Sequence, residues 1–228
     1  MRLFCLPYAG GSSVVFSKWP AYLDKTIELV PIELAGRRNR LLEPLYDDYQ
    51  EMVDDIVSML KSNIDSEYAI FGHSLGGYAA YDVFNTLKAN SLPLPQHVFF
   101  SGVAVPHLME TEKKYRGMSE EEFIKILKEF GGTPPEFFEY PELLEVFLPV
   151  LRSDFGLLET RDHTHNTTPL NIDITVFLGK DEPLTPKQCD GWKNYSDKIV
   201  TICYFEGGHF FLNSELDKMI QIINKNLK

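Results

Sequence analysis

Cysteine is scarce in this chain: Cys5, Cys189 and Cys203 are all there is, and they stand far apart. An odd number of cysteines at scattered spacings does not form a disulfide framework. Two of the three fall in predicted strands, where a thiol packs as a small apolar side chain. We therefore interpret all three as reduced and packed, which is typical of a cytoplasmic protein.

Positive charge is also in short supply, because 22 Lys and Arg against 33 Asp and Glu give a net charge of -11. This balance argues against nucleic acid or an anionic membrane surface as the main partner. No apolar run approaches the ~20 residues that a membrane-spanning helix needs. The chain enters its first predicted strand without the charged start and apolar stretch of a signal peptide. We expect a soluble, cytoplasmic protein with neither a nucleic-acid nor a membrane partner.

Short apolar runs alternate with helical patterns along most of the 228 residues. Alternation of this kind predicts crossover units, and hence an α/β fold with a mostly parallel central sheet covered by helices on both faces. We expect a single domain over residues 1–228. The predicted strands are residues 3–6, 27–34, 68–72, 97–102, 172–179 and 199–205.

The alternation breaks after residue 102, because the next predicted strand begins only at residue 172. Helical patterns at residues 118–130 and 148–160 lie in between, in a stretch dense in aromatic residues. We interpret residues 106–168 as a helical lid inserted between core strands, over the sheet edge where open α/β sheets bind ligands. His163 and His165 form a His-x-His pair there, but no cluster of further ligands accompanies them, so we expect a surface loop and no metal site.

A short segment, Gly72-His73-Ser74-Leu75-Gly76, stands between a predicted strand and a predicted helix. This is the pattern of a nucleophile elbow, in which a sharp turn presents a serine hydroxyl above a helix N-terminus. The glycines are needed because side chains would collide where the backbone doubles back. At average glycine and serine usage the pentapeptide occurs by chance in about one such chain in ten, so partners elsewhere must support it.

Serine needs a general base, and the base needs an acid that fixes its tautomer. In the α/β-hydrolase arrangement the three follow in the order serine, acid, histidine. His209 follows the last predicted strand in a glycine-rich loop, and Asp181 and Glu182 follow the strand before it. A spacing of three residues after Gly179 favours Glu182 as the acid, with Asp181 as the alternative. The predicted catalytic set is therefore Ser74, His209 and Glu182.

Two backbone N–H groups are predicted to form the oxyanion hole, those of Leu75 and Ala9. Ala9 lies in a glycine-rich loop after the first strand, which lacks the Lys-Ser/Thr ending of a phosphate-binding P-loop. These groups together define acyl transfer from an ester or a thioester through an acyl-enzyme. The triad does not distinguish the two substrates.

Arg37, Arg38 and Arg40 lie close together in an otherwise acidic protein. They are either a solvated loop or a basic patch for a phosphate group or an acidic partner, and the sequence leaves both open.

Several motifs in order along nearly the whole chain resemble the type II thioesterases, stand-alone α/β-hydrolases associated with nonribosomal peptide and polyketide synthases. The motifs are Pro7-Tyr8-Ala9-Gly10-Gly11-Ser12, Ala35-Gly36-Arg37 with Glu43-Pro44, Gly72-His73-Ser74-Leu75-Gly76-Gly77, Pro149-Val150-Leu151-Arg152-Ser153-Asp154-Phe155 with Leu158-Glu159-Thr160, and Gly207-Gly208-His209-Phe210-Phe211.

The resemblance implies hydrolysis of acyl groups misloaded on the 4′-phosphopantetheine arm of acyl or peptidyl carrier protein domains. It implies no cofactor beyond the arm that the substrate carries. It also implies catalytic roles for Ser74 and His209, oxyanion donors at Ala9 and Leu75, and a lid that covers the acyl chain. Arg37 and Arg38 are candidates for contact with the phosphate end of the arm or with the carrier, and a monomer suffices for the mechanism.

The chain departs from the family pattern at two positions. The family usually has aspartate where Glu182 stands, and often an aromatic residue where Arg161 follows Leu158-Glu159-Thr160. The sequence also resembles the thioesterases that release medium-chain acids from fatty acid synthases, which is the alternative enzyme. A small-molecule esterase and a non-catalytic carrier-binding protein are the remaining alternatives.

Overall fold

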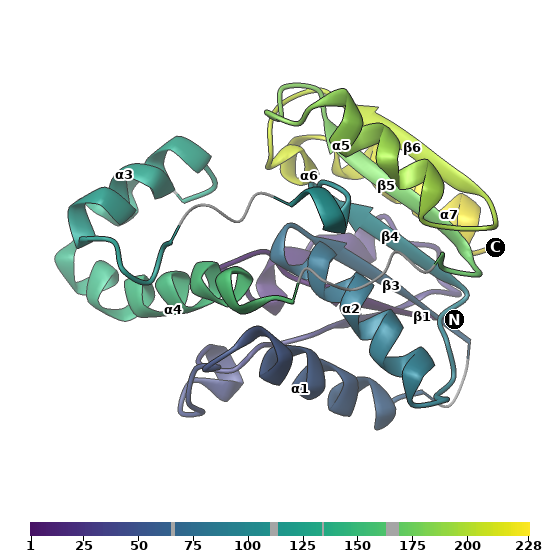
Figure 1. Cartoon of the computed structure of the whole chain (residues 1–228), viewed down its shortest axis with the longest axis horizontal. Coiled ribbons are helices and arrows are strands. Elements are labelled where there is room, and N and C mark those ends of the chain that lie inside the picture. Colours follow the sequence, from purple (N-terminus) through teal and green to yellow (C-terminus); the bar gives the residue numbers. More distant parts are fainter. Residues whose placement is uncertain (65–66, 110–113, 134, 163–168) are drawn as a thin grey trace.

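The computed structural model describes residues 1–64, 67–109, 114–133, 135–162 and 169–228 (Figure 1). Among these residues, six strands form one sheet in the order β2-β1-β3-β4-β5-β6, and every neighbouring pair is parallel. The α/β class and the parallel sheet are thereby confirmed. The strands are β1 (Arg2–Leu6), β2 (Glu28–Pro31), β3 (Tyr68–His73), β4 (His97–Ser101), β5 (Asp173–Gly179) and β6 (Val200–Phe205).

Helices connect the strands and cover both faces of the sheet (Figure 1). The α-helices are α1 (Tyr49–Lys61), α2 (Leu75–Ala89), α3 (Glu120–Phe130), α4 (Pro141–Thr160), α5 (Pro186–Asp190), α6 (Phe211–Ser214) and α7 (Leu216–Asn226). The 3₁₀ helices are η1 (Ser13–Phe16), η2 (Trp19–Ala21), η3 (Arg38–Arg40), η4 (Pro106–Leu108), η5 (Pro135–Phe138) and η6 (Gly191–Asn194).

The sheet separates two apolar cores, because successive side chains of a strand point to opposite faces. In β3, Ile70 packs in the core beneath α1, α2 and η6, whereas Phe71 packs in the core formed with η1, η2, α6 and α7. Both faces of the sheet are thus covered by apolar side chains. The central strands are therefore apolar throughout and show no alternation of apolar and polar residues. The carboxyl ends of all six strands meet at one edge of the sheet.

The segment between β4 and β5, called the insert below, carries η4, α3, η5 and α4. Its far end projects from the sheet at the left of Figure 1. It has a small core of its own, formed by Phe123 and Leu127 of α3 with Leu148 and Leu151 of α4. The expected helix over residues 148–160 is longer than the sequence predicts, because α4 runs for 20 residues straight through Pro149.

Among the residues that the structure describes, no helix is both long and apolar enough to cross a membrane. Within the same part of the chain, no group of three or more His, Cys, Asp or Glu side chains could hold a metal ion. His163 and His165 lie outside the described residues.

The first residue of β4 is a buried histidine, His97, and its titration makes the stability of the protein depend on pH. His97 Nε2 lies 2.9 Å from Thr175 Oγ1 on β5, and its ring stacks on Phe99. Burial disfavours the imidazolium and lowers the pKa of His97 to about 4, with Asp173 opposing the shift. Unfolding therefore takes up a proton between the ordinary histidine pKa and this lower value, and stability falls as the pH falls through that window.

We expect His97 to make the free energy of unfolding fall by about 1.4 kcal/mol per pH unit between roughly pH 6.5 and pH 4. His97→Gln should make this part of the profile shallower while keeping a polar group near Thr175; the slope that the second buried histidine, His73, contributes should remain. Urea unfolding of both proteins across that range measures the slopes, and equal slopes would contradict the assignment.

Candidate active site

Ser74 sits at the junction of β3 and α2 in a strained conformation, with φ 56° and ψ -119°. Non-glycine residues seldom adopt positive φ, and the few that do cluster at functional sites. The turn is fixed by Ser74 N–H, which donates to Ser101 O at 2.8 Å. A side chain at Gly72 would collide with the backbone of Gly76, so the elbow can close only with glycine there.

A histidine and a carboxylate meet at the same sheet edge. His209 Nδ1 lies 2.7 Å from Glu182 Oε1, and the other oxygen, Oε2, accepts from Gly179 N–H at 2.7 Å. The Glu182 side chain is only 3% exposed, whereas that of His209 is 19% exposed. With Nδ1 directed at the carboxylate, Nε2 is the nitrogen left to accept a proton from a hydroxyl.

The structure places Glu182, not Asp181, against His209. The residue Asp181 is exposed, and its backbone N–H donates to Gly207 O at 3.0 Å. The main chain of Asp181 therefore links the loop after β5, which carries Glu182, to the loop after β6, which carries His209. Glu182, which the spacing from Gly179 favours as the acid, is thus the residue whose side chain turns inward.

His209 lies next to the elbow. Its ring centroid is 5.0 Å from that of His73, the residue before Ser74. Gly102, just after β4, lies against both rings, and a side chain there would press on Cε1 of each. The ends of β3, β4, β5 and β6 thus converge around Ser74.

His73 is a contact of His209 to which sequence reasoning gave no role. It is fully buried, with Nδ1 2.9 Å from Ser101 Oγ. Burial, and next the neighbouring His209, lower the pKa of His73 well below its ordinary value. The ring beside His209 is therefore neutral. In the sequence, the place of His73 directly before Ser74 is the feature that could have indicated this contact.

The two predicted oxyanion donors also lie at this edge. Leu75 opens α2, where the helix itself offers its N–H no acceptor. Ala9 lies in the loop between β1 and η1, which packs under α2 through Gly76 and the Pro7 carbonyl. Within the described residues, neither the Leu75 nor the Ala9 N–H has a hydrogen-bond acceptor. Both are available to a developing oxyanion.

A partly buried serine on a strained elbow, a histidine held by a buried glutamate and two unoccupied N–H donors form an arrangement suited to acyl transfer. A family model described as Thioesterase domain matches residues 1–227. The chain belongs to the thioesterase family.

Relatives and solved structures agree with this assignment. The thioesterase is 31% identical to the gramicidin S biosynthesis protein GrsT of Aneurinibacillus migulanus, over 100% of this chain and 89% of that protein. It is 34% identical to the human medium-chain S-acyl fatty acid synthase thioesterase, over 92% of this chain and 80% of that protein. ClbQ of the colibactin NRPS/PKS pathway superposes with a TM-score of 0.92 at 29% identity, covering 99% and 96% of the two chains. The resemblance to thioesterases of these pathways is thus confirmed.

The arginines of the thioesterase do not form a common surface patch. Arg37 is buried, and its guanidinium makes a bidentate ion pair with Asp154, with both N–O distances 2.8 Å. The expectation that Arg37 contacts a carrier or its phosphate does not fit this placement, because the guanidinium is already occupied inside the protein. Arg38 is the exception: its side chain is 54% exposed and lies 3.5 Å from Glu33.

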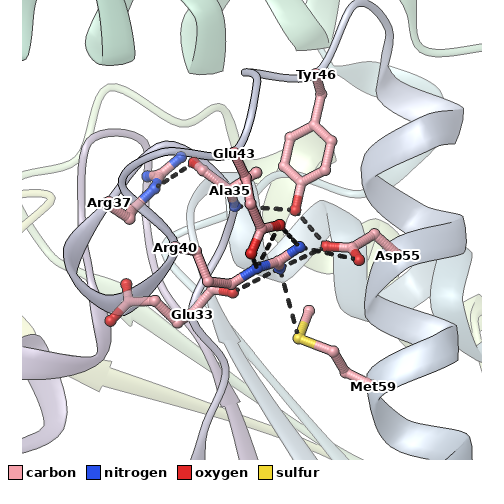
Figure 2. Close-up of polar contacts among 8 residues, drawn as sticks. All are labelled: Glu33, Ala35, Arg37, Arg40, Glu43, Tyr46, Asp55 and Met59. Atoms are coloured by element: carbon pink, nitrogen blue, oxygen red, sulfur yellow. Dashed lines mark hydrogen bonds and ion pairs between the residues drawn. The ribbon is translucent and has the colours of Figure 1, made fainter.

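Figure 2 shows the third arginine, Arg40, directed toward α1. Its guanidinium pairs with Asp55 at 2.7 Å and with Glu43, and it donates to Glu33 O at 3.0 Å. Tyr46 completes the group by donating its hydroxyl to Asp55. Arg40 therefore fixes the loop after β2 onto α1, and neither a basic patch nor a solvated loop describes it.

Arg161, which departs from the family pattern, is buried at the end of α4. Its Nε lies 2.7 Å from Asp82 Oδ2 on α2, and its guanidinium lies over the rings of Tyr49 and Tyr78. Tyr49 also donates its hydroxyl to Asp82 at 3.0 Å. The arginine thus fixes the end of the insert to the core through a buried charge pair.

Proposed function

We propose that this thioesterase hydrolyses acyl or aminoacyl thioesters on the 4′-phosphopantetheine arm of acyl or peptidyl carrier proteins, and so removes misloaded groups from a nonribosomal peptide or polyketide synthase. The contact between His209 and Glu182 beside the strained Ser74 carries the catalytic part. The similarity to GrsT and ClbQ supports the carrier-bound substrate. The substrate brings its own arm, so the reaction needs no further cofactor.

In the proposed reaction, Ser74 Oγ attacks the thioester carbonyl while His209 Nε2 takes the hydroxyl proton. Glu182 stabilises the imidazolium, and the N–H groups of Leu75 and Ala9 bind the oxyanion. Collapse of the tetrahedral intermediate breaks the C–S bond, and His209 gives its proton to the thiolate. Water activated by His209 then attacks the acyl-enzyme and releases the acid.

The insert, residues 106–168 in the sequence prediction, is the proposed lid. Two contacts bring its described part over the site: the ring of Phe130 lies 6.2 Å from that of His209, and Gly132 packs on the ring of Phe210. Apolar side chains of α4 such as Leu143 and Phe147 are exposed and could line an acyl chain.

The medium-chain fatty acyl thioesterase is the second candidate, and the 34% identity to the human enzyme favours it. The two functions differ in the carrier and in the load, not in the site. A non-catalytic carrier-binding role is disfavoured by the complete set of catalytic groups.

Release from loaded carriers tests the proposal. The wild type is assayed on carrier proteins bearing short acyl, medium-chain acyl or aminoacyl groups, on the matching acyl-pantetheines, and on oxygen esters of the same acids. Ser74→Ala is the control and should abolish release. Preference for short acyl or aminoacyl carriers supports editing, and preference for medium-chain loads supports the fatty acid alternative. Equal release by wild type and Ser74→Ala would leave only the binding role, and a preference for oxygen esters would indicate an esterase.

Arg38 is the proposed contact with the carrier. We expect Arg38→Glu to raise KM for an acyl-carrier protein by about threefold to tenfold, because an exposed charge at such a contact acts through attraction to the partner. The acyl-pantetheine should be hydrolysed as by the wild type. Lys225→Glu, in the last turn of α7, is the charge-matched control. Equal effects of Arg38→Glu on both substrates would exclude a carrier contact at this residue.

A further inference from the structure

The loop between β1 and η1, residues 8–13, is held in place by hydrogen bonds on both sides of Ala9. Tyr8 O accepts from Gly11 N–H at 2.8 Å, and Ser13 Oγ donates to Glu33 Oε2 at 2.6 Å. In a trans peptide the N–H points away from the carbonyl of the same unit. Because the Tyr8 carbonyl faces Gly11, the N–H of Ala9 is directed to the opposite side. Its direction therefore depends on where Gly10 and Gly11 are held.

A carboxylate from the insert holds Gly10. Asp154 of α4 accepts from Gly10 N–H at 2.7 Å through Oδ2, and its side chain is 1% exposed. One turn earlier in α4, Leu151 packs so tightly on Gly10 that a side chain there would collide with it. Helix α4 thus contacts the residue next to Ala9 through both an apolar and a charged side chain.

Arg37 fixes this carboxylate and the next residue of the loop. Its Nη1 donates both to Asp154 Oδ2 at 2.8 Å and to Gly11 O at 2.9 Å. Burial is the largest single effect on the pKa of Arg37 and lowers it. The charge of Asp154, its hydrogen bonds and the nearby Tyr46 and Glu33 together outweigh burial, so the pKa is raised and the guanidinium stays charged. Both planar groups are oriented by the bidentate contact, so the Asp154 carboxylate cannot turn away from Gly10.

We propose that Asp154 is a positioning residue for the oxyanion hole, acting with Arg37 to hold Gly10 and Gly11 so that the Ala9 N–H faces the reacting carbonyl. The inference rests on the proposed function, since it assigns a role within that mechanism. An oxyanion donor stabilises the transition state only when it is held in place beforehand. Loss of the contact between Asp154 and Gly10 should therefore lower kcat and leave KM nearly unchanged.

The chain offers a matched control. Asp82 is also a buried aspartate in a two-oxygen contact with an arginine at α4, Arg161, and it does not touch the loop. Four variants are compared on an acyl-pantetheine: Asp154→Asn, Asp154→Glu, Asp82→Asn and Asp82→Glu. The glutamates keep the charge of each pair and move the carboxylate by one methylene, so they leave no arginine of the pair without a carboxylate. An alkyl boronic acid, which forms a tetrahedral adduct on serine, probes the oxyanion hole directly.

We expect both Asp154 variants to lose roughly 10- to 100-fold in kcat with KM within about twofold, and to bind the boronic acid more weakly by a similar factor. Both Asp82 variants should keep kcat within about threefold. Equal kcat losses in the two pairs, or a loss confined to KM or to thermal stability, would overturn the proposal. If Asp154→Asn does not fold, Asp154→Glu decides alone. An inactive wild type, or one no faster than Ser74→Ala, refutes the proposed function instead.

Discussion

Replacing Glu182 by alanine should lower kcat for an acyl-pantetheine by roughly 10³- to 10⁴-fold. Without the carboxylate at 2.7 Å from Nδ1, the His209 ring loses the partner that fixes its tautomer and stabilises the imidazolium. The Gly179 N–H would lose its acceptor as well. KM should change little, because Glu182 acts through His209 and does not bind the acyl group.

Asp181→Ala is the matched control for this prediction. The residue Asp181 is exposed, and its backbone contact with Gly207 survives the substitution, so kcat should stay within about threefold of the wild type. Steady-state kinetics of both variants decide between the two acids. A loss of 10³ or more from Asp181→Ala alone would assign the role to Asp181.

Asp82→Ala should cost about 3–5 kcal/mol of stability, the largest loss that we expect from a single substitution outside the proposed catalytic site. The Arg161 side chain is 3% exposed, so its guanidinium would remain buried after losing the Asp82 carboxylate. The Tyr49 hydroxyl would lose its acceptor too. Urea unfolding followed by circular dichroism measures the difference in the free energy of unfolding.

Two further variants test whether a buried charge causes the loss of stability in Asp82→Ala. Asp190→Ala breaks the exposed pair with Lys193, whose side chain is 64% exposed, and should cost less than about 1 kcal/mol. In Asp82→Leu with Arg161→Met, neither charge of this pair is left buried, so much of the loss should be recovered. A double variant as unstable as Asp82→Ala would show that the buried charge of Arg161 is not the cause.

The strands and the site loops could be predicted because their signals are local. An apolar run buried on both faces marks β3, and the glycines around Ser74 are a local signal of the elbow, which the loops that carry Glu182 and His209 support. Glu182 could be preferred to Asp181 because a fixed spacing after a strand end decides which side chain points inward. His209 followed from the order of elements in the fold.

The arginines could not be predicted in this way, because their partners are distant in sequence. Arg37 and Asp154 are 117 positions apart, and Arg161 and Asp82 are 79 apart. A cluster of positive charge in sequence gives no indication that one member is buried and another is exposed. The start of α4 was missed for a related reason: Pro149 signals a helix end locally, whereas packing against α3 and the core lets the helix continue.

We expect Pro149 to divide helix α4 into two parts that open separately. Before Pro149, residues 141–147 are mostly exposed, and the missing N–H of the proline leaves the backbone ladder interrupted. After it, Asp154 and Arg161 fix the helix to the core by buried ion pairs. Local opening should follow this boundary, with amide exchange fast in the first half of α4 and slow in the second. The far end of the insert can therefore fluctuate without disturbing the backbone that faces the reacting carbonyl.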